Sequence, residues 1–164
     1  MVRAHKNVLN DYINFERDFR FDYFGFKTLE KGYLFKINGK VVERPQHLYM
    51  RVALALHQDS IEDVCKTYDL LSQGLYTQAS PTLFNAGKKF QNLSSCFLLN
   101  TADSIKDIYK TITDCALISK IGGGIGFHVS QVRAKGSRIR SSNGTSDGIV
   151  PMLKVFDETS FYCN

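Results

Sequence analysis

The pattern of apolar and polar positions predicts a hairpin followed by two helices in the first half of the chain. Asn38-Gly39 separates two short β-favouring runs, and this dipeptide is typical of a two-residue hairpin turn because both positions need positive φ. A helix is predicted over residues 45–57, with a proline at its first position. A second helix is predicted to begin after Ser60, which can cap it, and to end at Gly74.

In the second half, apolar runs that favour strands alternate with stretches of helical periodicity. The predicted order is a buried strand at 93–99, a helix capped by Asp103 or Ser104 and ending at Ile121, a strand at 125–133, a polar loop at 134–148, and a last helix opened by Pro151. This alternation is typical of an α/β fold. We therefore expect a mainly helical region with a small hairpin over residues 1–75 and an α/β domain over residues 76–164.

The composition excludes several classes of protein. Of the 164 residues, 43% are hydrophobic, and no apolar run approaches the roughly 18 residues of a membrane span. The N-terminal residues do not resemble a secretory signal. The four cysteines include no CxxC pair, which argues against a disulfide scaffold and a zinc site. We expect a soluble, cytoplasmic protein with no membrane partner and no resident metal.

The net charge of +5 does not by itself indicate a nucleic-acid partner. The basic residues are scattered, apart from one cluster that comprises Arg133, Lys135, Arg138 and Arg140. Phosphate groups on a small ligand explain such a cluster more economically, so no nucleic-acid binding is predicted.

Each cysteine can be interpreted in a structural or a chemical sense. Cys65 and Cys115 fall on the apolar faces of predicted helices, where a thiol packs as a small hydrophobe. Cys96 follows two serines in an apolar strand, and packing is again the simpler interpretation. A redox role for Cys96 would need a second cysteine within disulfide reach, and the sequence identifies none.

Two further segments could bind a phosphorylated ligand. The glycine run at 122–126 lies between a helix and a strand, the reverse of the dinucleotide-binding order, so it serves either anion binding or close packing. Asp103, Arg133 and the basic loop at 134–144 could hold a nucleotide, with the carboxylate on a sugar hydroxyl and guanidinium groups on phosphate. The alternative is a helix cap followed by a solvated turn.

Several segments together resemble the large subunit of class I ribonucleotide reductase, in its eukaryotic form. They are Ala79–Gly87, Leu93–Phe97, Asp18–Leu29, Lys36–Lys40, Glu43–His47, Cys115–Lys120 and Val150–Val155. The order and spacing of these segments are similar to those in that family over most of the chain, from Asp18 to Phe156.

The resemblance implies a fold and an activity. The family reduces ribonucleoside diphosphates to deoxyribonucleotides by radical chemistry inside a ten-stranded α/β barrel. This chain would supply an N-terminal helical region and the first strands and helices of that barrel. The alternative is a catalytically inactive module that only binds a nucleotide or dimerises.

The resemblance also assigns residues. Ser80 and Ser95 match substrate contacts, Cys96 matches one of two cysteines that supply reducing electrons, and Gly123 and Gly124 match backbone beside the substrate. The specificity-effector site, which binds a dNTP or ATP with Mg²⁺ at a dimer interface, is matched by Asp103, Ser104, Ile105, Lys120, Arg133 and Arg140. Arg140 occupies a position that is often held by a small residue in the family.

The implied partners are the remainder of the large subunit, a radical-generating small subunit, a second copy of the chain, and thioredoxin or glutaredoxin as external reductant. The radical cysteine and the second reductant cysteine of the family have no counterpart in this sequence. We therefore expect the isolated segment to be inactive and to depend on a partner for solubility.

Overall fold

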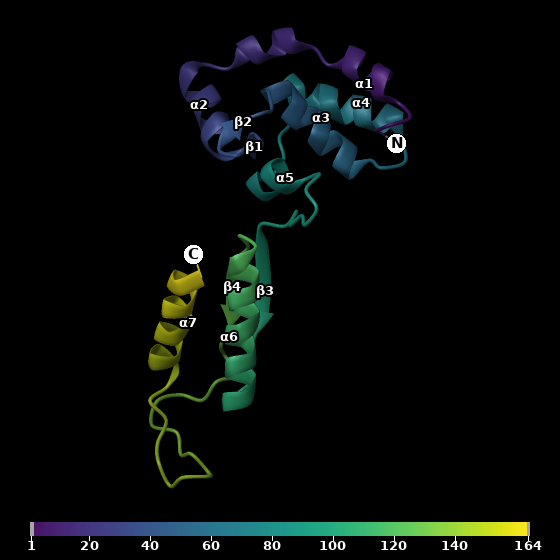
Figure 1. Ribbon diagram of the computed structural model, residues 1–164. Coiled ribbons are helices and arrows are strands. Elements are labelled where there is room, and N and C mark those ends of the chain that lie inside the picture. Colours follow the sequence, from purple (N-terminus) through teal and green to yellow (C-terminus); the bar gives the residue numbers. More distant parts are fainter. Residues whose placement is uncertain (1, 164) are drawn as a thin grey trace. The chain divides into compact units, whose positions relative to one another are not determined.

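The computed structural model describes residues 2–163, which form two compact units that divide between Leu93 and Ser94 (Figure 1). The first unit is mainly helical, and the second contains a parallel strand pair with two helices. This arrangement confirms the predicted combination of a helical region with an α/β region. Neither sheet closes into a barrel within residues 2–163. None of the helices described is both long and apolar enough to cross a bilayer.

The first unit contains six helical segments and one hairpin. In order they are α1 (Lys6–Tyr12), the 3-10 helix η1 (Phe15–Arg20), α2 (Tyr23–Gly32), β1 (Lys36–Ile37), β2 (Lys40–Val41), α3 (Pro45–Leu56), α4 (Ile61–Ser72) and α5 (Ser80–Asn85). The predicted hairpin is confirmed, with φ values of 51° at Asn38 and 76° at Gly39. The Ser60 side chain accepts a hydrogen bond from the Asp63 amide and caps α4, as the sequence predicts.

The core of the first unit is built on α3. Leu48 and Val52 on α3 join a cluster with Leu34, Leu71 and other buried side chains. A second cluster is formed mainly by Met50, Ala53, Val64, Tyr68 and Leu9. Because α3 supplies residues to both clusters, it is buried on most of its circumference and fixes α4 beside it.

An almost fully buried ion pair ties the hairpin, α3 and α5 together. The Arg51 Nε atom donates to Glu43 Oε1 at 2.7 Å, and side-chain exposure is only 12% for Arg51 and 7% for Glu43. The Arg51 guanidinium also donates to the carbonyl oxygens of Leu83 and Ala86. The Glu43 carboxylate accepts a hydrogen bond from the Phe35 amide at 2.9 Å. The pair therefore satisfies backbone groups from segments far apart in the sequence.

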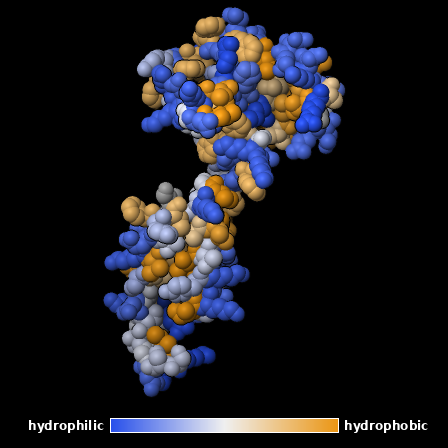
Figure 2. All heavy atoms as spheres, viewed as in Figure 1, coloured by the Kyte–Doolittle hydropathy of each residue, from blue (hydrophilic) through white to orange (hydrophobic). Residues whose placement is uncertain are grey.

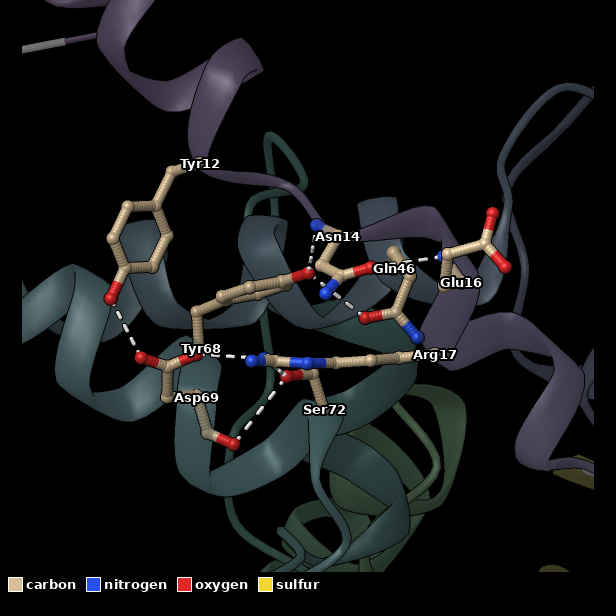
Figure 3. Close-up of polar contacts among 8 residues, drawn as sticks. All are labelled: Tyr12, Asn14, Glu16, Arg17, Gln46, Tyr68, Asp69 and Ser72. Atoms are coloured by element: carbon tan, nitrogen blue, oxygen red, sulfur yellow. Dashed lines mark hydrogen bonds and ion pairs between the residues drawn. The ribbon is translucent and has the colours of Figure 1, made fainter.

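A polar network joins the N-terminal segment to α4 (Figure 3). Asp69 accepts a hydrogen bond from the Tyr12 hydroxyl at 2.6 Å and forms an ion pair with Arg17 at 2.7 Å. The buried Tyr68 hydroxyl donates to Gln46 Oε1. Burial by itself would raise the pKa of Asp69, but the bonds from Tyr12 and Arg17 outweigh it and lower this pKa. The bond to Asp69, followed by burial, raises the pKa of Tyr12 to about 12.

The raised pKa of Tyr12 predicts a loss of stability in alkali. A tyrosine whose pKa is higher in the folded than in the unfolded chain stabilises the fold below its ordinary pKa of 10, and that contribution is lost as the pH rises towards about 12. Tyr12→Phe should flatten the decline in the free energy of unfolding between pH 10 and 12, measured by urea denaturation. An equally steep decline in the variant would contradict the assignment.

The second unit is a strand–helix–strand unit followed by a loop and a helix. Its elements are β3 (Cys96–Asn100), α6 (Ile105–Lys120), β4 (Gly124–His128) and α7 (Ile149–Cys163). β3 and β4 are parallel, with Cys96 opposite Gly124 and Asn100 opposite His128. The Phe127 ring stacks on the buried Phe156 ring of α7, with their centroids 4.3 Å apart. This contact fixes α7 against β4.

Four expectations about local structure are corrected. The buried strand expected at 93–99 is β3, which begins later and alternates between exposed and half-buried side chains, because successive side chains point to opposite faces of the sheet and the faces are not equally covered among the residues described. The strand expected at 125–133 ends at His128. The last helix begins at Ile149, two residues before Pro151. The thiol of Cys65 is half-buried rather than in the core, whereas the packing role of Cys115 is confirmed by its burial.

The helix α5 is absent from the predicted elements, and it packs within the first unit. Its carbonyl groups at Leu83 and Ala86, the latter just beyond its end, accept hydrogen bonds from Arg51. The second domain predicted from the sequence instead begins at residue 76. That boundary between functional domains stays a prediction.

Candidate functional site

A pocket of about 880 Å³ lies in the second unit, between the N-terminal end of α6, the loop after β4 and the start of α7. Five of the six predicted effector residues line it, namely Asp103, Ser104, Ile105, Arg133 and Arg140. The volume is in the range of small-molecule sites in proteins. The sixth residue, Lys120, is at the opposite end of α6, about 22 Å away along the helix axis at 1.5 Å per residue.

An ion pair forms the polar wall of this pocket. Arg133 Nε donates to Asp103 Oδ2 at 2.7 Å, and Arg133 Nη2 donates to the Asp103 carbonyl oxygen at 3.4 Å. Both side chains are about one-third exposed, 33% for Arg133 and 32% for Asp103. The pair therefore links two segments that are 30 residues apart and still presents polar atoms to the pocket.

The N-terminal end of α6 is capped by a side chain. The Ser104 hydroxyl accepts a hydrogen bond from the Asp107 amide at 3.1 Å and donates one to the Asp107 carboxylate at 2.5 Å. Its hydroxyl is thus engaged in the cap predicted from the sequence. Asp103, the other capping candidate, instead pairs with Arg133.

The basic loop after β4 is an ordered hairpin rather than a simple solvated turn. The Ser146 amide donates to the Ser137 carbonyl at 2.9 Å, and the Ile139 amide donates to the Gly144 carbonyl at 2.8 Å. At its base, Gly148 has a φ of 80°, and a Cβ added there would lie 2.9 Å from the Lys135 nitrogen. These contacts hold the loop along the pocket.

Another part of the pocket lining is apolar. It includes Ile105, Ile108, Tyr109 and Ile112 on α6 and Val155 on α7. Figure 2 shows apolar side chains gathered on the visible face of the second unit. One polar wall and one apolar wall suit a ligand with an anionic end and a less polar ring.

The pocket contains residues to which the sequence analysis gives no ligand role. Ile108 and Tyr109 are not among the predicted site residues, yet both line the pocket and Tyr109 is 57% exposed. Ile108 and Tyr109 follow Ile105 by three and four residues, and this spacing predicts that they lie on the same face of α6 as Ile105. Arg138 also lines the pocket, and it belongs to the loop at 134–144 that the sequence proposes for nucleotide binding.

The predicted substrate residues of the second unit meet where β3 and β4 begin. The Gly124 amide donates to the Ser95 carbonyl at 2.8 Å, and Cys96 lies opposite Gly124 in the strand register. Cys96 is exposed, and all four cysteines are free thiols. Gly123 serves close packing, because a Cβ there would lie 2.6 Å from the Ile118 side chain and 2.7 Å from the Phe97 ring.

Ser80 belongs to the first unit. It begins α5, is exposed, and its hydroxyl lies 3.0 Å from the Tyr33 hydroxyl. Within residues 2–163, no three His, Cys, Asp or Glu side chains are grouped so that they could hold a metal ion.

Comparison with known proteins matches two family models in succession. Residues 19–91 match the ribonucleotide reductase all-alpha domain, and residues 94–164 match the ribonucleotide reductase barrel domain. The two matches divide where the two compact units divide.

Individual relatives give the same result. A ribonucleoside-diphosphate reductase large subunit from Arabidopsis thaliana is 58% identical over 155 residues, which cover 94% of this chain and 19% of the relative. The variola virus large subunit is 56% identical over 163 residues (99% and 21%), and large chain 2 of Saccharomyces cerevisiae is 53% identical over 163 residues (99% and 19%). The chain spans about a fifth of the length of these curated relatives. Both family models and these identities show that the chain belongs to the family of ribonucleotide reductase large subunits.

Proposed function

We propose that this chain is part of a ribonucleoside-diphosphate reductase large subunit and that its pocket binds a dNTP or ATP effector. The observation that carries the proposal is the Asp103–Arg133 pair in a pocket with three guanidinium groups and an apolar wall. A carboxylate can accept a hydrogen bond from a ribose hydroxyl, and guanidinium groups can bind phosphate oxygens through paired hydrogen bonds. Ser104 and Ile105 would contact the nucleotide from the first turn of α6.

The Mg²⁺ ion expected with the effector would enter with the triphosphate. Phosphate oxygens and water satisfy the octahedral preference of Mg²⁺ without a dedicated protein cage. The donor set of the pocket fits that arrangement, because Asp103 is the one carboxylate that lines it among the residues described. Its pairing with Arg133 favours a role in orienting the nucleotide rather than in holding a metal.

The start of β3 and β4 would form part of the substrate site. Cys96 would be one of two thiols that supply electrons, with Ser95 and the backbone at Gly123 and Gly124 beside the ribonucleoside diphosphate. Ser80, in the first unit, stays a predicted substrate contact. The exposed thiol of Cys96 and its pairing with the small residue Gly124 leave room for a ligand to approach.

The partners follow from the same proposal. Because Lys120 lies at the far end of α6 from the pocket, a second copy of the chain would have to supply it to a neighbouring effector site. The remainder of the large subunit, a radical-generating small subunit, and thioredoxin or glutaredoxin would complete the enzyme in the cytoplasm.

Asp103→Ala tests the effector site. We expect dTTP affinity to fall about tenfold, because a charge-assisted hydrogen bond is lost and Arg133 loses its partner. Ribonucleoside-diphosphate affinity without effector should be unchanged. Both are measured by isothermal titration calorimetry on the natural protein that contains this sequence.

Asp157→Ala is the matched control, because Asp157 is an exposed carboxylate on α7 outside the pocket. Equal dTTP affinity in the Asp103 variant and the unmodified protein would remove Asp103 from the site. Effector binding without any ribonucleotide reduction in the natural protein would instead indicate the catalytically inactive nucleotide-binding module.

A further inference from the structure

Ser80, a predicted substrate contact, is hydrogen-bonded to a tyrosine to which the proposed function gives no role. The hydroxyl oxygens of Ser80 and Tyr33 lie 3.0 Å apart, although the two residues are separated by 47 positions in the sequence. Both belong to the first unit, with Tyr33 at the C-terminal end of α2 and Ser80 at the first position of α5. The bond therefore links two helices at the exposed side chain of Ser80.

The Tyr33 ring is held in place by its surroundings. It is half-buried against the hydrophobic cluster that contains Leu48, and its backbone amide donates to the Leu29 carbonyl at 2.8 Å. The ring also contacts the Phe84 ring, with the centroids 5.9 Å apart and the planes inclined at 60°. Because Phe84 and Ser80 are both on α5, these contacts fix the Tyr33 hydroxyl relative to Ser80.

The Ser80 side chain has no comparable packing. It is exposed, and a serine hydroxyl can occupy any of three staggered rotamers. Among the residues that the structure describes, Tyr33 is the side chain to which the Ser80 hydroxyl bonds. The tyrosine therefore determines which rotamer of Ser80 is favoured.

The direction of the hydrogen bond follows from the chemistry of the predicted ligand. A hydroxyl offers one proton and two lone pairs, so either oxygen can be the donor in the free protein. The diphosphate oxygens of a ribonucleoside diphosphate only accept hydrogen bonds. If Ser80 gives its proton to such an oxygen, Tyr33 must donate to Ser80, and each bond in this chain polarises the other.

We propose that Tyr33 is a positioning residue for the substrate, because its hydroxyl donates to Ser80 and aims the Ser80 proton at a diphosphate oxygen. The inference rests on the predicted substrate contact of Ser80. Tyr33 acts through Ser80 and makes no contact with the reacting atoms. Its hydroxyl therefore contributes to substrate binding and not to the reduction step.

Tyr33→Phe in the complete enzyme tests the inference. The phenylalanine ring keeps the contacts with Phe84 and the hydrophobic cluster, so the variant loses only the bond to Ser80. We expect the KM for CDP to rise about threefold to tenfold, as for loss of one hydrogen bond, with kcat unchanged. Steady-state assays of dCDP formation over a range of CDP concentrations measure both constants.

A double-mutant cycle measures the dependence on Ser80. Ser80→Ala should raise the KM for CDP at least as much as Tyr33→Phe does. In the double variant the KM should rise by less than about twofold beyond that of Ser80→Ala, because the tyrosine hydroxyl then has no serine to position.

Tyr12→Phe is the matched control. It also removes a tyrosine hydroxyl from the first unit, but this hydroxyl bonds to Asp69 on α4 and not to α5. The KM for CDP should be unchanged in this variant. Urea denaturation should show little change in the stability of Tyr33→Phe, since the bond that it loses is exposed.

The outcomes separate this inference from the assignment on which it rests. If Ser80→Ala raises the KM but Tyr33→Phe does not, or if the two increases multiply in the double variant, Tyr33 does not position Ser80 and the substrate contact of Ser80 stands. If Ser80→Ala leaves the KM unchanged, the substrate contact itself is wrong and the inference is wrong with it. A lower kcat with an unchanged KM in Tyr33→Phe would also contradict the inference.

Discussion

Cys96→Ser should abolish sustained reduction of ribonucleoside diphosphates by the complete enzyme and leave dTTP binding unchanged. In the proposed reaction, Cys96 and a second thiol of the large subunit each give up one electron and one proton to the substrate and form a disulfide. A serine hydroxyl cannot form that bond, so neither the reduction nor the regeneration by thioredoxin or glutaredoxin can proceed. We expect turnover to fall by at least about a hundredfold, as for loss of a group that reacts covalently.

The exposure of Cys96 and the burial of Cys115 support this assignment. Cys96 is exposed where β3 begins, whereas Cys115 is buried on α6 and its pKa is raised by burial and by Asp114. A buried, protonated thiol is less reactive than an accessible one. Steady-state assays of dCDP formation from CDP, with excess reductant, measure the effect.

Cys65→Ser is the control for Cys96→Ser. Cys65 is a half-buried thiol on α4, and burial followed by the charge of Asp69 raises its pKa. This variant should retain turnover. Unchanged turnover in Cys96→Ser would remove Cys96 from the reductant pair.

Glu43→Ala should cause the largest loss of stability, about 3–5 kcal/mol, as expected when one member of a buried ion pair is removed. The Arg51 guanidinium would keep its bonds to the carbonyl oxygens of Leu83 and Ala86 but lose its counter-ion in a site where it is only 12% exposed. The Phe35 amide would also lose its acceptor. Urea denaturation, together with hydrogen exchange of amides in α3 and α5, measures the loss.

The exposed pair between Lys27 and Glu30 provides the matched control. Its nitrogen–oxygen distance, 2.6 Å, is close to that of the buried pair, but its side chains are 48% and 36% exposed. Glu30→Ala should therefore cost far less stability than Glu43→Ala. Similar losses in Glu43→Ala and Glu30→Ala would show that burial of the Arg51 pair does not determine its contribution.

The comparison between the two pairs also bears on how the first unit is held together. The hydrophobic clusters on α3 do not include the hairpin strands or Glu43. Arg51 connects this segment to α3 by its ion pair with Glu43 and by stacking its guanidinium 3.8 Å from the centre of the Phe35 ring. One side chain thus joins the hairpin segment, which the apolar clusters leave out, to the core helix α3.

Much of the local structure was determined by the sequence itself. Asn38-Gly39 specified the hairpin because the turn needs positive φ at both positions. Ser60 marked the start of α4, and Asp103 or Ser104 the start of α6, because short polar side chains cap exposed amides. These signals depend on neighbours in the chain and so do not need the tertiary fold. The resemblance to ribonucleotide reductase likewise depended only on short sequence segments and on their order along the chain.

Other features were decided only by tertiary structure. The exposure of β3 depends on which strands and helices cover it, and the sequence pattern of an apolar strand cannot report that. The Asp103–Arg133 pair joins residues that no local rule connects, and Lys120 is separated from them by the length of α6. The pocket exists because α6, the loop after β4 and α7 converge, and convergence of distant segments is a property of packing rather than of sequence spacing.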